Sequence, residues 1–340
     1  MAAETPTRVA VVGGGSFGRN HLRVYRDLPA AQLVAIVDTS EQARHALAAE
    51  YGVPAFASVE ELLTAGLNIE AASVCVPTVQ HAAIAQTLLR HGIDVLIEKP
   101  ISSTLEEADA ILATAEQHSR IVQVGHLERF NPAVTAAVPL MNKPMFFEAH
   151  RLSVFTPRSL DVDVVLDLMI HDLDVVLSLV QSPVAEVRAV GLPVLSRKVD
   201  IANVRLEFEN GCVANFTASR VSTERVRKLR FFQPHQYLSL DFARQDLLMI
   251  DVTAAASLTP QQLEAVFAAQ QTAEHPSQGL SLRKVPTTPG EPLRLELEAF
   301  VNAVQTRTTP RVTAQDARKA LALALQITDA IKQHTHRAGL

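Results

Sequence analysis

The chain has 340 residues, of which 48% are hydrophobic and 20% are charged, a balance typical of a globular protein with two packed domains. Its formal net charge of -5 excludes a general attraction to nucleic acid or to an anionic membrane surface. The sequence shows no signal-peptide pattern and no run approaching about 18 apolar residues, so we expect a cytoplasmic protein that does not insert into membranes. Two cysteines, Cys75 and Cys212, are too few for a disulfide framework.

Short apolar runs rich in β-branched residues alternate with helical stretches through the first 125 residues. The runs cover residues 9–12, 33–37, 73–76, 95–97 and 121–124. Such alternation predicts a parallel sheet wrapped by helices, and the nearly continuous hydrophobicity of the runs fits strands that are covered on both faces. We therefore expect residues 1–125 to form a doubly wound α/β domain.

The pattern changes after residue 126. A strongly apolar helix is expected around residues 164–180, followed by strands in which apolar and polar residues alternate. Asn210-Gly211, between two such strands, is a strong hairpin signal. These features predict that residues 126–340 form an α+β domain with an open, largely antiparallel sheet. Two helices, near residues 292–306 and 314–333, close the chain, and packing of the last helix against the first domain is left open.

A glycine-rich turn follows the first strand. Gly13, Gly15 and Gly18 have the spacing G-x-G-x-x-G, and Ser16 and Phe17 complete the turn before the expected helix. In this spacing the first glycine permits a tight turn, the second lets the backbone approach a pyrophosphate, and the third allows close helix packing. The helix N-terminus then offers N–H groups and a positive dipole to phosphates. The turn predicts a Rossmann-type dinucleotide site.

An acidic residue ends the second strand. Asp38 lies 20 residues after Gly18, where a carboxylate accepts hydrogen bonds from the hydroxyls of the adenosine ribose. Its charge opposes a 2′-phosphate, which favours NAD over NADP as the cofactor, although Arg44 would reverse this preference if it turned inward. The alternative interpretation is a glycine-rich turn beside an acidic helix cap, without a cofactor.

Further motifs stand at the ends of later strands, the edge at which open α/β sheets bind ligands. Pro77-Thr78 with His81 follows one strand, and Glu98-Lys99-Pro100 follows another. Together with the glycine turn, residues 125–132 and the pair Asp167 and His171, these motifs resemble the glucose-fructose oxidoreductase, inositol dehydrogenase and rhizopine-catabolism (Gfo/Idh/MocA) family. The resemblance extends over nearly the whole chain.

The resemblance implies an NAD(P)-dependent oxidoreductase whose second domain often forms subunit contacts through its open sheet, and hence a homodimer or homotetramer. It implies that Lys99 lies beside the nicotinamide and that the Lys99-Pro100 peptide bond is cis. The cofactor contacts expected beyond the glycine turn and Asp38 come from Pro77, Thr78, His81, Glu98 and Lys99.

The residues themselves suggest alcohol oxidation, which needs a base for the hydroxyl proton while hydride leaves the same carbon. Lys99 and His171 are both candidate bases, and the choice between them stays open. Asp167 lies one helical turn before His171 and would orient the substrate. Taken alone, such a pair is more often a helix ion pair, and Lys99 alone would be a surface lysine. No metal signature is present.

Several cations near the expected cleft are candidates for substrate binding. They are Arg129, with Asn131 beside it, Arg151 and Arg158, in addition to Asp167 and His171. Residues 220–230 hold five cationic side chains and one acidic residue, which suggests either an anion site or an exposed sheet face with salt bridges.

Residues 129–132 and 161–174 resemble the branch of the family that acts on nucleotide-linked N-acetyl sugars. The expected reaction is therefore oxidation of UDP-N-acetylglucosamine at C3 with reduction of NAD. The alternative is a free-sugar or inositol dehydrogenase, which would not need the arginine-rich strand. A non-catalytic NAD-binding regulator is a third hypothesis, and the presence of Lys99, Asp167 and His171 argues against it.

Overall fold

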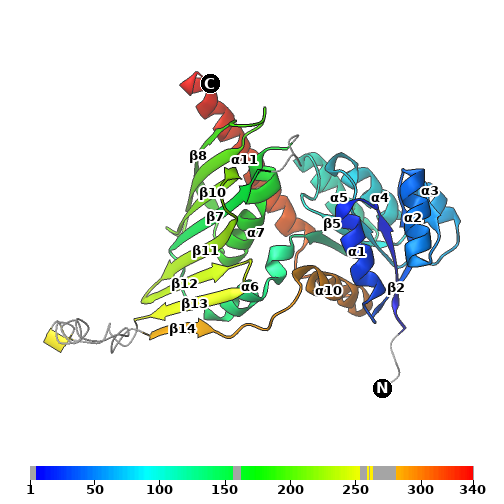
Figure 1. Cartoon of the computed structure of the whole chain (residues 1–340), viewed down its shortest axis with the longest axis horizontal. Helices are drawn as coiled ribbons and strands as arrows, with labels where there is room; N and C mark the ends of the chain where they lie inside the picture. The colour runs from blue at the N-terminus through cyan, green and yellow to red at the C-terminus, as the bar shows by residue number, and fades with distance from the viewer. Residues whose placement is uncertain (1–4, 156–161, 253–258, 260, 263–280, 340) are drawn as a thin grey trace. The chain divides into compact units, whose positions relative to one another are not determined.

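The computed structural model describes residues 5–155, 162–252, 259, 261–262 and 281–339. The chain divides into two compact units (Figure 1). The first unit contains residues 1–130 and 291–322, and the second contains residues 131–290 and 323–340. Residues 291–322, which the sequence placed in the second domain, thus return to the first unit.

The first unit is built on a six-stranded parallel sheet with the order β3-β2-β1-β4-β5-β6. The strand order reverses between β1 and β4, which is where doubly wound folds bind dinucleotides. Its strands are β1 (Thr7–Val12), β2 (Ala31–Val37), β3 (Ala55–Phe56), β4 (Ala71–Val74), β5 (Asp94–Glu98) and β6 (Val122–Gly125). The helices of residues 1–130 are α1 (Ser16–Arg26), α2 (Glu41–Tyr51), α3 (Val59–Thr64), η1 (Thr78–Gln80), α4 (His81–Arg90), α5 (Leu105–Gln117) and η2 (Leu127–Phe130).

Side-chain caps fix where several of these helices begin. Ser40 and Ser58 accept hydrogen bonds from backbone N–H groups in the first turns of α2 and α3. Thr104 and Glu107 form a reciprocal capping box at the start of α5. By contrast, Gly15 caps α1 without a side chain, so the N-terminus of α1 keeps its N–H groups available to a ligand.

The helix α10 (Pro292–Thr306) explains why residues 291–322 belong to the first unit. Its residues Leu297, Phe300 and Val301 are fully buried in the apolar core formed by β1, α1 and β2. The following helix, α11 (Ala314–Ala338), starts in the first unit and ends in the second.

The second unit contains an eight-stranded sheet with the order β14-β13-β12-β11-β7-β10-β9-β8. Only β7 and β10 pair in parallel within it, so the expectation of a largely antiparallel sheet is confirmed. Its strands are β7 (Phe146–Val154), β8 (Val184–Leu192), β9 (Ile201–Phe208), β10 (Val213–Ser222), β11 (Val226–Gln233), β12 (Gln236–Asp241), β13 (Asp246–Asp251) and β14 (Ser281–Val285). Its other elements are α6 (Pro132–Ala137), η3 (Val138–Leu140), the π-helix η4 (Val165–Met169) and α7 (Ile170–Leu179).

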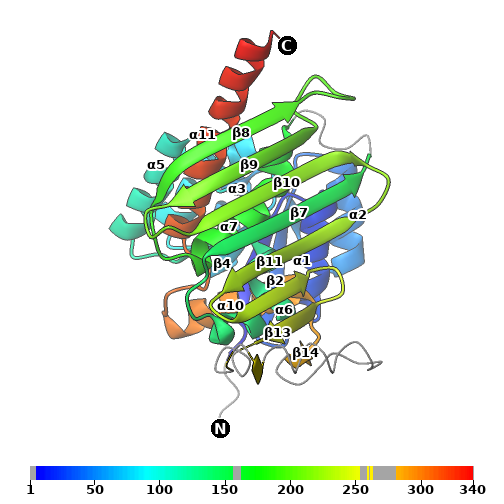
Figure 2. The same cartoon turned by 90° about the vertical axis from the view of Figure 1, so that its left-hand side faces the viewer.

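The two faces of this sheet differ. Along β9 the side chains of Ala202, Val204 and Leu206 are buried, whereas Asn203 and Arg205 between them are exposed. Figure 2 shows the sheet from its open face, which no helix in the described part of the second unit covers. The alternation predicted from the sequence therefore corresponds to a sheet with one face packed and one face open. No helix in the described part of the chain is both long and apolar enough to cross a membrane.

Candidate cofactor and catalytic site

The glycine turn between β1 and α1 is shaped by close backbone contacts. A Cβ atom on Gly18 would overlap the carbonyl oxygen of Gly13, and one on Gly13 would lie 2.5 Å from the carbonyl oxygen of Cys75. Gly13 also has a φ of +99°, a conformation that side chains rarely adopt. A Cβ atom on Gly15, in contrast, would meet nothing within 4 Å, so this face of the turn opens to a ligand.

The carboxylate of Asp38 is held against this turn. Its Oδ2 accepts a hydrogen bond from the Gly14 N–H at 2.7 Å, and its Oδ1 accepts one from the Ser40 N–H at 2.8 Å. Each carboxylate oxygen can accept a second hydrogen bond, so Asp38 retains capacity for ribose hydroxyls. Arg44 donates to the carbonyl oxygens of Asp38 and Thr39, both at 3.0 Å, which ties its guanidinium to the main chain there.

A pocket of about 530 Å³ lies beside the turn and is lined by residues of the first unit. The predicted cofactor residues among its lining are Gly13, Gly15, Asp38 and Pro77. Its size falls within the range of small-molecule and cofactor pockets, about 300 to 1,000 Å³. The open N-terminus of α1, the acid and the pocket therefore fit an adenine dinucleotide.

Thr78 and His81 lie just after β4. Thr78 starts η1. His81 is buried, and its ring nitrogens lie 2.9 Å from the carbonyl oxygens of Val76 and Pro100. His81 thus links the segments that follow β4 and β5, and it is absent from the lining of the pocket.

Glu98 and Lys99 stand at the end of β5, and the Lys99-Pro100 peptide bond is cis, as the resemblance implied. The Glu98 Oε1 lies 2.9 Å from the His21 Nε2, and its Oε2 accepts a hydrogen bond from the Lys99 N–H at 3.3 Å. Burial opposes the charge of this carboxylate, but the hydrogen bond from His21 and the charge of Lys99 outweigh it and lower the pKa of Glu98. Glu98 is therefore a buried anion beside Lys99.

His126 is a neighbour of Lys99 that the sequence did not single out as catalytic. It follows β6 and is almost completely buried. Burial, together with the positive charges of Lys99 and Arg129, lowers its pKa to about 3. The imidazole is consequently neutral at physiological pH.

Asp167 and His171 lie in the second unit, where the π-helix η4 passes into α7. Both side chains are partly exposed. The wider turn of a π-helix occurs frequently at functional sites. Asp172, next to His171, has a different setting, because both of its oxygens accept hydrogen bonds of 2.8 Å from the buried Arg151. This ion pair joins α7 to β7 and accounts for the burial of Arg151 without a substrate.

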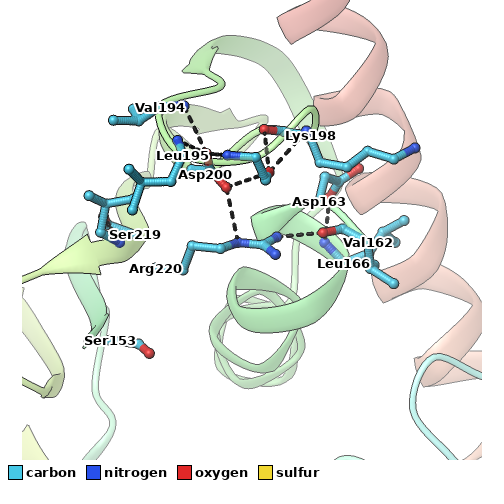
Figure 3. Close-up of polar contacts among 12 residues, drawn as sticks. Ser153, Val162, Asp163, Leu166, Val194, Leu195, Lys198, Asp200, Ser219 and Arg220 are labelled. Atoms are coloured by element: carbon cyan, nitrogen blue, oxygen red, sulfur yellow. Dashed lines mark hydrogen bonds and ion pairs between the residues drawn. The ribbon is translucent and has the colours of Figure 1, made fainter. Parts of the chain in front are cut away.

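A buried polar network holds the chain at the start of η4 (Figure 3). Arg220 of β10 donates to the Val162 carbonyl oxygen, and its Nε lies 3.6 Å from the Asp200 carboxylate. Asp200 also accepts hydrogen bonds from the N–H groups of Val194, Leu195 and Ser196 at 2.8, 2.6 and 2.7 Å. Burial alone would raise the pKa of Asp200, but the N–H groups and the Ser196 hydroxyl outweigh it and lower the pKa to about 2.

This network changes the interpretation of the arginine-rich residues 220–230. Arg220 is almost completely buried and serves the interior of the second unit. Arg230 forms a partly exposed ion pair with Glu148 at 3.7 Å. Two of its five cations therefore have different surroundings, because Arg220 lies in the interior of the second unit and Arg230 lies at a partly exposed strand.

The remaining predicted substrate residues have structural contacts of their own. Asn131 caps α6 by accepting from the Ala133 N–H at 3.1 Å, and it donates to the Phe242 carbonyl oxygen at 3.0 Å. Arg129 donates to the Arg311 carbonyl oxygen at 3.4 Å. Arg158 lies outside the described residues. Within the described ranges, no group of three His, Cys, Asp or Glu side chains is arranged to hold a metal ion.

The structure thus groups the candidate residues by unit. The glycine turn, Asp38, Glu98 and Lys99 belong to the first unit, whereas Asp167 and His171 belong to the second. Sequence reasoning missed His21, because it lies inside α1 and outside any recognised motif. Its position three residues after Gly18, on a helix face that is otherwise apolar, was the only available signal.

Comparisons with known proteins agree with this organisation. Residues 7–126 match the model of the oxidoreductase family with an NAD-binding Rossmann fold, and residues 143–233 match the GFO/IDH/MocA C-terminal domain. The UDP-N-acetylglucosamine 3-dehydrogenase of Acidithiobacillus ferrooxidans is 34% identical over 97% of this chain and 99% of its own length. A solved structure of that enzyme superimposes with a TM-score of 0.85 and covers 97% of this chain and 99% of the other.

A more distant relative has a different substrate. The scyllo-inositol 2-dehydrogenase (NAD(+)) of Bacillus subtilis is 26% identical over 64% of this chain and 69% of its own length. Two family models that together cover more than half of the chain, and a full-length relative above 30% identity, lead to one assignment. The chain belongs to the Gfo/Idh/MocA family of oxidoreductases, and its N-terminal domain is an NAD-binding Rossmann domain.

Proposed function

We propose that this protein oxidises the C3 hydroxyl of UDP-N-acetylglucosamine to a ketone and reduces NAD. The observation that carries the proposal is the full-length similarity to the Acidithiobacillus ferrooxidans UDP-N-acetylglucosamine 3-dehydrogenase, at 34% identity. It extends through the second unit, in which the family's substrate residues are expected. The inositol dehydrogenases match over a smaller share of the chain, 64% in the Bacillus subtilis case.

The first unit would hold the cofactor. The N-terminus of α1 and the open face at Gly15 suit the pyrophosphate, and the Asp38 carboxylate suits the adenosine ribose. NAD, when bound, supplies a hydride acceptor. The negative charge of Asp38 lies where NADP would carry a 2′-phosphate, so NAD is the expected cofactor.

Side chains of this protein would carry out the proton transfer. In the proposed reaction the neutral Nζ of Lys99 removes the hydroxyl proton while hydride leaves the same carbon. His171 is the competing base, and Asp167 would hold the substrate in place. Substrate contacts from Arg129, Asn131, Arg151 and Arg158 stay predictions.

One observation favours a substrate without a diphosphate. Two arginines that were expected to bind a diphosphate, Arg151 and Arg220, have partners inside the second unit. Arg151 pairs with Asp172, and Arg220 contacts Asp200 and Val162. This arrangement leaves fewer cations for a nucleotide and favours a free sugar or inositol as the alternative substrate.

The substrate test compares UDP-N-acetylglucosamine, UDP-glucose, glucose and myo-inositol side by side, with NADH absorbance as the readout and a carbonyl trap to draw the reaction forward. We expect turnover with UDP-N-acetylglucosamine. Turnover of the free sugar or inositol without any response to the UDP-sugars would refute the proposed substrate and support the alternative.

The base is tested by Lys99→Met and His171→Ala in single-turnover experiments. Loss of a positioned acid or base typically costs about 10²- to 10⁴-fold in rate. We expect a loss of this size for Lys99→Met with NADH binding retained. A rate near that of the unmodified protein would remove Lys99 from the mechanism and leave His171 as the base.

We further propose a cytoplasmic homo-oligomer. Cys75 and Cys212 are both free thiols, as expected in a reducing compartment. The uncovered face of the second unit's sheet carries partly exposed apolar side chains such as Val190, Phe232 and Leu248. Exposed faces of this kind commonly bind a second subunit.

A further inference from the structure

We propose that His21 is a positioning residue for the oxidation. With Ser73 and Tyr25 it forms a buried chain of hydrogen bonds that fixes the Glu98 carboxylate next to Lys99. The proposal rests on the role proposed above for Lys99. In this proposal, buried residues of the first unit hold the negative charge of Glu98 beside Lys99.

The chain crosses three elements of the first unit. The Tyr25 hydroxyl of α1 lies 2.8 Å from the Ser73 Oγ of β4, and this Oγ lies 3.1 Å from the His21 Nδ1. The His21 Nε2 lies 2.9 Å from the Glu98 Oε1 at the end of β5. The Glu98 Oε2 then accepts from the Lys99 N–H at 3.3 Å. Four contacts thus connect the apolar core to the main chain of Lys99.

With a neutral His21 ring, one arrangement of hydrogens satisfies every link. Glu98 is anionic and only accepts, so the His21 Nε2 must carry the proton it donates. The His21 Nδ1 then accepts from the Ser73 hydroxyl, and the Ser73 oxygen accepts from the Tyr25 hydroxyl. All donors point toward the carboxylate, and hydrogen bonds aligned in this way polarise one another in a low-dielectric interior. Burial raises the pKa of Tyr25, which keeps its hydroxyl a donor.

The surroundings leave the Glu98 carboxylate little freedom. A Cβ atom on Gly125 would lie 3.0 Å from the Glu98 Oε2, so the glycine in β6 makes room for this oxygen. His21 and Ser73 are completely buried, and Tyr25 is 1% exposed. Because the chain ends at Tyr25 within the core, it offers no route for protons to solvent. Its function is to hold a charge in place.

Other ionisable groups also act on this chain and on its neighbourhood. Cys75 and Glu296 interact electrostatically with Tyr25, and Cys75 also with Glu98. On the side of Lys99, the charges of Lys99, Arg129, Glu98 and Asp316 act on His126. Among these groups, Glu98 is the carboxylate that adjoins Lys99 in the sequence and binds its backbone. Glu98 is therefore the group through which His21 reaches the proposed base.

The expected effect has a defined sign. Without the His21 donor, Glu98 loses its strongest stabilising partner and is able to turn or to take up a proton. A weaker or more distant negative charge favours the neutral form of Lys99, so the pKa of Lys99 falls. The limb of the pH–rate profile that reports deprotonation of Lys99 then moves to lower pH. The maximal rate falls as well, because the lysine main chain is no longer held.

The test uses His21→Leu, which removes the donor at similar volume, and His21→Gln, whose amide keeps a donor near the position of Nε2. Exposed His45, on α2, provides the control His45→Leu. For His21→Leu we expect kcat to fall by about 10- to 100-fold, the loss typical when a hydrogen-bond partner that orients a metal ligand is replaced. NADH affinity should change much less than kcat, since the glycine turn and Asp38 are untouched, and His21→Gln should restore much of the rate.

Tyr25→Phe supplies a second variant in case His21→Leu fails to fold, because it removes only one hydroxyl. It should move the pH limb in the same direction by a smaller amount. A direct readout is independent of the substrate: the Lys99 ¹³Cε chemical shift, assigned by its loss in Lys99→Arg, reports the pKa of this amine by NMR titration.

The outcomes separate this inference from the proposed function. If Lys99→Met retains full single-turnover activity, the proposed base is wrong, whereas a lowered Lys99 pKa in His21→Leu would still support the hydrogen-bonded chain. If the Lys99 titration and the pH–rate profile are the same in the unmodified protein, His21→Leu and Tyr25→Phe, the positioning role of His21 is refuted.

Discussion

Replacing Asp200 with asparagine should destabilise the second unit far more than the loss of an exposed acid. The Asp200 carboxylate accepts three backbone N–H groups of residues 194–196 and the Ser196 hydroxyl, and it faces Arg220. Asparagine keeps one carbonyl oxygen for the N–H groups. Its NH₂ group, however, would meet the donors of Ser196 and Arg220, and the charge that balances Arg220 would be lost.

The pKa gives the size of the effect. A pKa lowered from 3.8 to about 2 means that the folded protein stabilises the charged form of Asp200 relative to the unfolded chain. At about 1.4 kcal/mol for each pKa unit, this preference corresponds to about 2.5 kcal/mol. We expect Asp200→Asn to lower the free energy of unfolding by about 2 to 3 kcal/mol at pH 7.

The pH dependence follows from the direction of the shift. Because the pKa of Asp200 is depressed in the folded state, its contribution is complete above the unfolded value near 3.8 and is lost as the pH falls through about 2. The difference in stability between the unmodified protein and Asp200→Asn should therefore be constant from pH 7 to 5 and shrink between about pH 4 and 2.

Urea unfolding followed by far-ultraviolet circular dichroism at several pH values measures this difference. Asp329→Asn is the matched control, because Asp329 forms an exposed pair with Lys332 and should change stability by less than about 0.5 kcal/mol. A loss below about 0.5 kcal/mol for Asp200→Asn at pH 7, or a difference that does not change down to pH 2, would refute the reasoning.

Three further predictions concern the cofactor and assembly. The protein should bind NADH more tightly than NADPH in a fluorescence titration, and Asp38→Ala should reduce this preference. Equal affinities for the two cofactors in the unmodified protein would point to Arg44 as a partner of the 2′-phosphate. Gly18→Ala should abolish NADH binding and lower the melting temperature, because its Cβ would overlap the Gly13 carbonyl oxygen. Gly15→Ala should fold normally and weaken only NADH binding, because a Cβ atom there meets nothing within 4 Å. Equal melting temperatures for the two variants would contradict the packing argument. Light scattering at micromolar concentration should give the mass of a dimer or tetramer, and a monomeric mass would mean that the open sheet face stays exposed to water.

The features that were predictable from the sequence depend on short-range patterns. The spacing of Gly13, Gly15 and Gly18 determines a tight turn within six residues. The continuous apolar runs of the first 125 residues indicate strands of a sheet that is covered on both faces. The Asn210-Gly211 hairpin is equally local, with Gly211 at a φ of +84°. For these elements, neighbouring residues carry the whole signal.

The features that were not predictable depend on contacts between distant residues. Arg151 and Asn131 look in the sequence like polar residues near a cleft, but the structure gives them Asp172 and Phe242 as partners, 21 and 111 residues away. His21 is likewise explained only by Glu98, 77 residues later. A sequence pattern reveals that a buried polar residue needs a partner, but it does not reveal which one.

The return of α10 to the first unit bears on how the protein is made. When the ribosome has completed residues 1–130, the core of that unit lacks Leu297, Phe300 and Val301, and the apolar side chains of β1 and α1 that they cover remain in contact with water. At a synthesis rate of about 5 to 20 residues per second, the chain needs roughly 10 to 30 s to reach residue 291. Throughout that interval the nascent polypeptide carries a nucleotide-binding fold whose core is still incomplete.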